Sequence, residues 1–151
     1  MQSTVTPASH GIDAHRIMKG LYQGAFPKSP QLLARAGFDV VVFCAKEHQP
    51  AQSRFPNVYS IYCPLNDDGS PMRPEEWEWA QRTAHIVADL RRDGAKILVS
   101  CAMGINRSGL VSALTVHDLT GLPGSQCVEF VRSRRPGALT NSYFVRALRN
   151  M

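Results

Sequence analysis

The chain has 151 residues, of which 44% are hydrophobic and 19% are charged, a composition that fits one domain with a buried core. No apolar run approaches the roughly 20 residues that cross a membrane, and the first residues lack the apolar segment of a signal peptide, so neither a membrane span nor export is expected. The four cysteines are therefore expected to be reduced thiols of a cytoplasmic protein. Because none forms a Cys-x-x-Cys pair, no metal site is predicted.

The chain is basic, with a net charge of +5 and an isoelectric point of about 9.3. Two interpretations of this charge stay open: a field that attracts acidic partners, or an ordinary solvated surface. The basic clusters at 91–92 and 132–135 are not interleaved with aromatic residues, so nucleic acid is not an expected partner.

The N-terminal third predicts a tail, a hairpin and a short helix. Residues 1–15 are expected to form a flexible tail, and segment 16–24 predicts a strand or hairpin at the start of the domain. Segment 29–36 predicts a helix with Ser29 as its N-cap and Gly37 just after its end. Further patterns predict strands over 40–44 and 58–63, and helices over 74–93, 125–134 and 140–148.

The longest predicted helix, 74–93, carries acidic residues in its first turn and two arginines near its end, as the helix dipole favours. Its apolar positions include Trp79, Ile86 and Leu90, and we expect Trp79 and Ile86 to lie in the core. Strands that alternate with helices predict an α/β fold with helices on the faces of the sheet.

The segment 96–119 carries the main functional signal. Ile97, Leu98 and Val99 predict a buried strand, and the apolar spacing from residue 110 onward predicts a helix. The loop between them begins with Cys101 and ends with Arg107 and Ser108. It would lie at the carboxyl end of a strand, where α/β sheets bind ligands.

A loop that leads into a helix N-terminus directs backbone N–H groups and the positive end of the helix dipole at one point. Such an anion site favours the thiolate form of Cys101, and the planar fork of Arg107 would hold two phosphate oxygens. Ser108 would donate a hydrogen bond to the sulfur, and Ser100 precedes the thiol. The residues expected to surround the phosphate are Ala102, Met103, Gly104, Ile105 and Asn106 together with Arg107.

Cys101 to Arg107, followed by Ser108 and Gly109, resembles the signature of the cysteine-dependent protein tyrosine phosphatases, and the dual-specificity branch is the most similar. The resemblance implies a single catalytic domain over 16–151 with a mostly parallel central sheet flanked by helices. It also implies hydrolysis of phosphotyrosine proteins, with phosphoserine and phosphothreonine as further substrates, through a phosphocysteine and without a cofactor. The family has His where this chain has Ser100, which puts the tuning of the thiolate in doubt.

The mechanism also needs an acid that protonates the leaving oxygen. The segment Pro64-Leu65-Asn66-Asp67-Asp68-Gly69 resembles the family's acid loop. Family loops with the pattern Pro-x-x-Asp indicate Asp67 as the acid, whereas family loops with the pattern Asp-Gly indicate Asp68. We prefer Asp67. The later segment from Arg135 to Asn141 resembles a family segment whose Asn supports the phosphate-binding loop, a role expected for Asn141.

Two other functions remain as alternatives. Gly104 to Gly109 is similar to the loop of RNA 5′-triphosphatases of the same superfamily. The absence of the family's His before Cys101 also leaves a catalytically impaired phosphate-binding module as a possibility. The physiological substrate and the oligomeric state are left open by the sequence.

Overall fold

The computed structural model describes residues 11–151; residues 1–10 of the expected tail lie outside the described part. The first strand already begins at Ala14, within the range expected to be tail. In chain order the elements are β1 (Ala14–Met18), β2 (Leu21–Ala25), α1 (Pro30–Arg35), β3 (Val40–Ala45), a 3-10 helix (Gln52–Arg54), β4 (Tyr59–Leu65), α2 (Pro74–Arg92), β5 (Ile97–Cys101), α3 (Arg107–Thr120), α4 (Gly124–Arg134) and α5 (Ser142–Arg149).

The five strands form one sheet in the order β1-β2-β5-β3-β4. β1 and β2 are antiparallel, which confirms the predicted hairpin, and the remaining pairs are parallel. The mostly parallel α/β sheet is the predicted fold class. Because β5 lies between β2 and β3, its carboxyl end is in the middle of the sheet.

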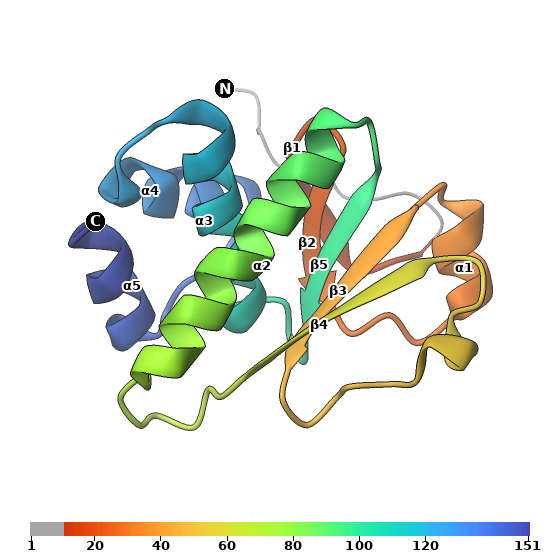
Figure 1. Cartoon of the computed structure of the whole chain (residues 1–151), viewed down its shortest axis with the longest axis horizontal. Helices are drawn as coiled ribbons and strands as arrows, with labels where there is room; N and C mark the ends of the chain where they lie inside the picture. Colours follow the sequence, from red (N-terminus) through yellow and green to blue (C-terminus); the bar gives the residue numbers. More distant parts are fainter. Residues whose placement is uncertain (1–10) are drawn as a thin grey trace.

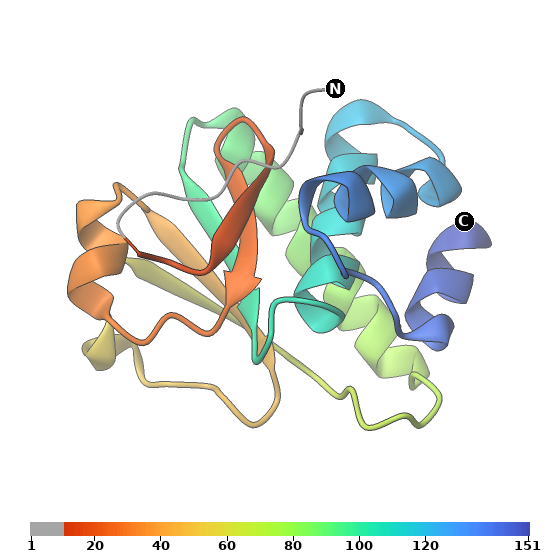
Figure 2. The ribbon, with the colours of Figure 1, turned by 180° about the vertical axis from the view of Figure 1, so that it is seen from behind.

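The sheet separates two layers of helix (Figures 1 and 2). Helices α2 to α5 pack on one face over a core that includes Val42, Val99 and Leu110. α1 packs on the other face over a smaller core that includes Val41 and Leu98. Successive residues of β3 and β5 point to opposite faces, so their unbroken apolar runs serve both cores.

One side chain of α2 departs from the prediction. Ala80, Ala84 and Val87 form the buried face of the helix, whereas Ile86 is 44% exposed, so the prediction that Ile86 lies in the core is wrong. Small residues at spacings of four and three let α2 approach α3 and β4 closely, and this contact rotates Ile86 outward. Trp79 is partly buried and packs against the larger core.

The carboxyl ends of three neighbouring parallel strands meet at one edge of the sheet. They lie at Ala45 of β3, Leu65 of β4 and Cys101 of β5, and each is followed by a loop. α3 begins at Arg107, so Arg107 and Ser108 belong to its first turn. This edge therefore brings the expected acid loop and the Cys101 loop together.

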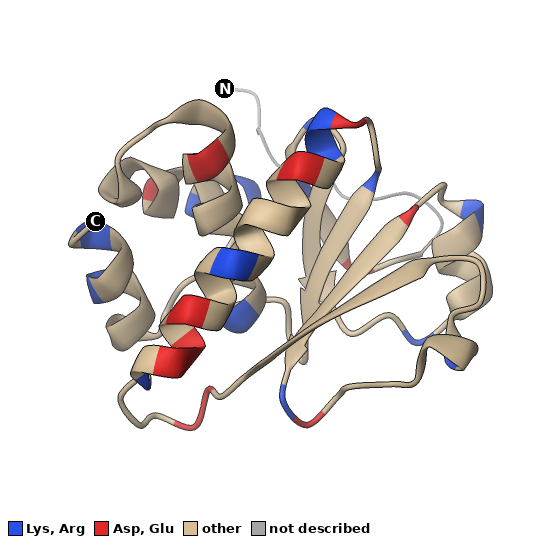
Figure 3. Ribbon diagram, viewed as in Figure 1, with Lys and Arg blue, Asp and Glu red and all other residues tan. Residues whose placement is uncertain are grey.

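Figure 3 shows acidic and basic residues mixed along α2. The outer surface of this helix is therefore neither uniformly acidic nor uniformly basic. None of the helices within residues 11–151 is long and apolar enough to cross a membrane.

Candidate active site

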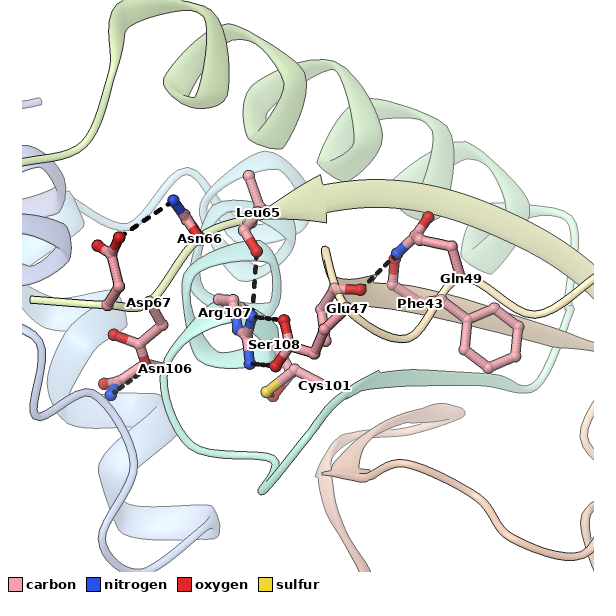
Figure 4. A network of polar contacts seen from close by, with 12 residues as sticks. Phe43, Glu47, Gln49, Leu65, Asn66, Asp67, Cys101, Asn106, Arg107 and Ser108 are labelled. Atoms are coloured by element: carbon pink, nitrogen blue, oxygen red, sulfur yellow. Dashed lines mark hydrogen bonds and ion pairs between the residues drawn. The ribbon is translucent and has the colours of Figure 1, made fainter. Parts of the chain in front are cut away.

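The centre of the site is the junction of β5, its loop and α3. Cys101 is the last residue of β5 and only 4% exposed. Its Sγ lies 3.2 Å from Oγ of Ser108, which is fully buried in the first turn of α3 (Figure 4). The sulfur therefore lies beside a hydroxyl at a helix N-terminus, where negative charge is stabilised.

The loop between Cys101 and Arg107 is held from outside through its carbonyl groups. A planar trans peptide directs C=O and N–H to opposite sides, so carbonyls bonded outward turn the N–H groups of the loop inward. The bonds are Phe26 N to Ala102 O at 3.5 Å, Arg135 Nη2 to Met103 O at 3.0 Å, Arg135 Nε to Gly104 O at 3.1 Å, Gln23 Nε2 to Gly104 O at 3.0 Å, and Leu139 N to Ile105 O at 3.0 Å.

Arg135 is the main support of this loop. Its side chain is only 7% exposed, and its Nη1 contacts Asp13 Oδ1 at 2.8 Å and His15 Nδ1 at 2.9 Å. Burial and the charge of Arg135 lower the pKa of His15, and the charge of Asp13 raises it. The net effect is a pKa below the ordinary value. Sequence reasoning did not assign a support role to Arg135 or Gln23. For Arg135 the available signal was its place at the start of the Arg135–Asn141 segment, and for Gln23 it was a polar residue within the predicted strand.

Gly104 lies at the point where the loop comes closest to β2. Its φ is +72°, and an added Cβ would lie 2.4 Å from the Gly24 carbonyl carbon and 2.7 Å from the Ala25 nitrogen. Both the backbone conformation and the space therefore require glycine here.

Arg107 is fixed by a carboxylate that the sequence did not assign to the site. Nη1 and Nη2 of Arg107 donate to the two oxygens of Glu47 at 2.6 and 2.8 Å, and Nη1 also donates to Leu65 O at 3.1 Å (Figure 4). The hydrogen bond from Arg107 lowers the pKa of Glu47 from 4.5 to about 2. The Nε of Arg107 is buried without a hydrogen-bond partner in the described part of the chain. A buried, unpaired donor on a cation is suited to an anionic ligand.

The two candidate acids occupy different environments. Asp67 accepts a hydrogen bond from Asn106 Nδ2 at 3.0 Å through Oδ2 and from Asn141 Nδ2 at 2.8 Å through Oδ1. The Asp68 carboxylate instead accepts from the backbone and hydroxyl of Ser70, which lowers its pKa, and both aspartates are exposed. Of the two carboxylates, Asp67 is therefore the one that is hydrogen-bonded to the loop between Cys101 and Arg107, through Asn106.

Asn141 links three parts of the site. Its Oδ1 accepts from the backbone of Tyr143 and Phe144 as the N-cap of α5, while its amide nitrogen donates to Asp67. Its own backbone N–H donates to Asn106 Oδ1 at 2.8 Å. Asn106 therefore joins the loop to both Asp67 and Asn141.

Ser100 does not contact the loop through its side chain. Its Oγ donates to Val42 O at 2.8 Å, and the residue is completely buried. The hydroxyl thus ties β5 to β3 immediately before Cys101. The surroundings hold no metal centre: in residues 11–151, no group of three His, Cys, Asp or Glu side chains is arranged to hold an ion.

A mostly parallel sheet whose central strand ends in a Cys-x5-Arg loop at a helix N-terminus defines the class of cysteine-dependent phosphatases. The chain belongs to the dual specificity phosphatase catalytic-domain family, which it matches over residues 21–151. This confirms the resemblance inferred from the motif.

Individual relatives agree with this placement. The chain is 28% identical to dual specificity protein phosphatase 15 of Rattus norvegicus over 131 residues, which are 85% of this chain and 53% of the relative. It is 27% identical to dual specificity protein phosphatase 12 of the same species over 146 residues, 93% of this chain and 42% of the relative. The chain thus spans about half the length of the curated relatives that it matches.

Solved structures show the same fold. A mouse dual specificity phosphatase complexed with zinc tungstate superposes with a TM-score of 0.79 at 26% identity, covering 98% of this chain and 91% of the other. Human DUSP28 gives a TM-score of 0.77 at 25% identity, covering 99% and 95%.

Proposed function

We propose that this chain hydrolyses phosphate monoesters on tyrosine-phosphorylated proteins, and also on phosphoserine and phosphothreonine, through a phosphocysteine intermediate. The catalytic unit would include β1, which begins at Ala14 and so extends the expected domain of 16–151 at its start, and the reaction would use no cofactor. The observation that carries the proposal is the buried Nε of Arg107, which has no hydrogen-bond partner among residues 11–151. It lies at the end of the loop that begins with Cys101, and it offers a donor for a phosphate oxygen beside a nucleophile.

In the first step, the Cys101 thiolate attacks phosphorus, so that an S–P bond forms as the P–O bond to the substrate breaks. Asp67 gives its proton to the leaving oxygen. Arg107 and the inward N–H groups of residues 103–106 hold the equatorial oxygens, where negative charge is spread in the transition state.

In the second step, water attacks the phosphocysteine and passes a proton to the Asp67 carboxylate. The S–P bond breaks, inorganic phosphate leaves, and the sulfur returns as a thiolate. The 3.2 Å contact from Ser108 Oγ to the sulfur supports a role for this hydroxyl in stabilising the departing thiolate. The structure of the mouse relative is a complex with zinc tungstate, and tungstate is a tetrahedral oxyanion like phosphate, which supports an oxyanion-binding function for this chain.

The test is turnover of an aryl phosphate and of a phosphotyrosine peptide by the wild type and by Cys101→Ser. The wild type is expected to release phosphate from both, whereas Cys101→Ser is expected to lose turnover and still bind tungstate. Cys127→Ser is the matched control, since Cys127 is a buried thiol of α4. Full activity of Cys101→Ser would refute the mechanism, and faster release from a triphosphate-ended RNA than from the peptide would favour the triphosphatase alternative.

A further inference from the structure

A second concave region adjoins the phosphate-binding loop on the side of β2. It has a volume of about 510 Å³, within the usual range for ligand pockets. It lies between the segment before β1, the β2–α1 connection and the start of the loop, whose proximity is visible in Figure 2 and fixed by the bond from Phe26 N to Ala102 O. Its lining includes Ile12, Phe26, Lys28, Leu32, His48 and Met103.

Met103 is the unexplained residue of the loop. The residue is 69% exposed, although its side chain is large and apolar, and it belongs to the lining of this pocket. Arg135 holds its carbonyl at 3.0 Å, so the backbone that carries the side chain is fixed. Phosphate binding by backbone N–H groups needs no apolar side chain at this position. Met103 shares this pocket with the apolar side chains of Ile12, Phe26 and Leu32. Apolar groups that gather at one place on a surface mark an interaction site.

The opposite wall of the pocket is equally well fixed. The Phe26 ring lies 5.1 Å from the His48 ring, 5.7 Å from the Phe43 ring and 6.4 Å from the Phe55 ring, measured between centroids. These aromatic contacts hold Phe26 against the smaller core. A wall that is ordered before binding loses little entropy when a ligand arrives.

The pocket and the acid lie at opposite ends of the loop. Ala102 and Met103, at the start, line the pocket, while Asn106, at the end, holds Asp67 at 3.0 Å. A phosphorylated side chain seated in the loop therefore has Asp67 on one side and the pocket on the other. The rest of a peptide substrate has room to extend toward the pocket.

From this geometry we infer that the pocket is a specificity subsite for a large apolar side chain, leucine or phenylalanine, within three residues of the phosphorylated residue of the substrate. The inference rests on the proposed function and names the class of peptide that it favours. Continuity with the phosphate-binding loop makes a substrate side chain the occupant, because Ala102 and Met103 belong both to that loop and to the lining of the pocket.

The experiment measures kcat/KM for phosphotyrosine peptides of one neutral sequence, in which leucine, phenylalanine or alanine occupies each of three positions on either side of the phosphotyrosine. The wild type is expected to prefer leucine or phenylalanine over alanine by about tenfold at one position, the gain from burying such a side chain. Leu32→Gln and Ile12→Asn place polar groups in two different walls and are expected to reduce this preference to about twofold. Ile86→Gln, an exposed apolar position on α2, is the matched control and is expected to keep it.

Because the readout is a ratio between peptides, it is independent of a general loss of activity or of folded protein in a variant. A wild type without preference at any position, or a preference that survives in both variants, would overturn the subsite. Failure to turn over para-nitrophenyl phosphate and all peptides would instead overturn the proposed function. The affinities of the same peptides for the chain would then decide the subsite, with the same ranking expected and a flat ranking contradicting it.

Discussion

Glu47 and Arg107, 60 positions apart in the sequence, form a bidentate ion pair with N–O distances of 2.6 and 2.8 Å. Glu47 follows the end of β3 and Arg107 opens α3, so the pair exists only because β3 and β5 are neighbours in the sheet. It engages both terminal nitrogens of the guanidinium, while Nε has no hydrogen-bond partner within the part of the chain that the structure describes. Glu47 is thus a positioning residue for the cation at the centre of the site.

Replacing this carboxylate tests the positioning role. Glu47→Gln keeps the shape of the side chain but loses the charge and one acceptor, so Arg107 is expected to sample other rotamers. We expect KM for an aryl phosphate to rise about tenfold with a smaller change in kcat, measured by steady-state kinetics. Lys46→Gln, the neighbouring exposed charge, is the control, and an unchanged KM in Glu47→Gln would contradict the assignment.

The low pKa of Glu47 gives a pH dependence with a definite sign. A carboxylate whose pKa falls from 4.5 to about 2 on folding adds stability above pH 4.5, and loses it as the pH falls toward 2. The difference in unfolding free energy between wild type and Glu47→Gln should therefore be constant from pH 5 to 8 and shrink below pH 4.5. Urea unfolding at pH 7, 5 and 3 measures it. A difference that changes between pH 5 and 8 would require another titrating group.

The two aspartates are separated by paired variants. Asp67→Asn is expected to reduce kcat on a phosphotyrosine peptide by about 100-fold or more, the usual contribution of a general acid, and to flatten the acid-dependent limb of the pH profile. Asp68→Asn should stay within about twofold, since its carboxylate is bonded to Ser70. The opposite pattern would transfer the acid role to Asp68.

Gly104 provides a prediction about the loop itself. Gly137 has a φ of +85°, and a Cβ added there would meet no other atom within 4 Å. Gly137→Ala should therefore cost only the backbone strain, about 1 kcal/mol of stability. Gly104→Ala adds a clash with the backbone of Gly24 and Ala25, so it should destabilise further and lose turnover and oxyanion binding together. Thermal unfolding and tungstate binding measure the two effects. Equal behaviour of the two variants would show that the close approach is unimportant.

The role of Arg135 is tested by Arg135→Lys, which keeps the charge but not the fork that reaches two carbonyls. We expect a fall in kcat of about tenfold or more with little change in far-UV circular dichroism. Arg134→Lys is the control, because Arg134 lies over the Phe130 ring instead of at the loop. Wild-type kcat in Arg135→Lys would mean that the remaining bonds to the loop suffice.

The sequence alone determined the features that depend on neighbouring residues. The β1–β2 hairpin, the helix capped by Ser29 and the strand–loop–helix around Cys101 follow from hydrophobic periodicity, capping chemistry and a motif a few residues long. The same information identified the family. The sequence wrongly predicted that Ile86 lies in the core. The buried face of α2 is set by its packing against α3 and β4, and Ile86 lies outside that face.

Only the tertiary structure decided which distant residues complete the site. Gln23, Glu47 and Arg135 reach the loop from 81, 60 and 31 positions away, and Asp67 rather than Asp68 contacts Asn106. These contacts depend on the order and register of parallel strands, which place their carboxyl ends side by side whatever their separation in the chain. No local pattern carries that order, because it results from the packing of the whole sheet between its two helical layers.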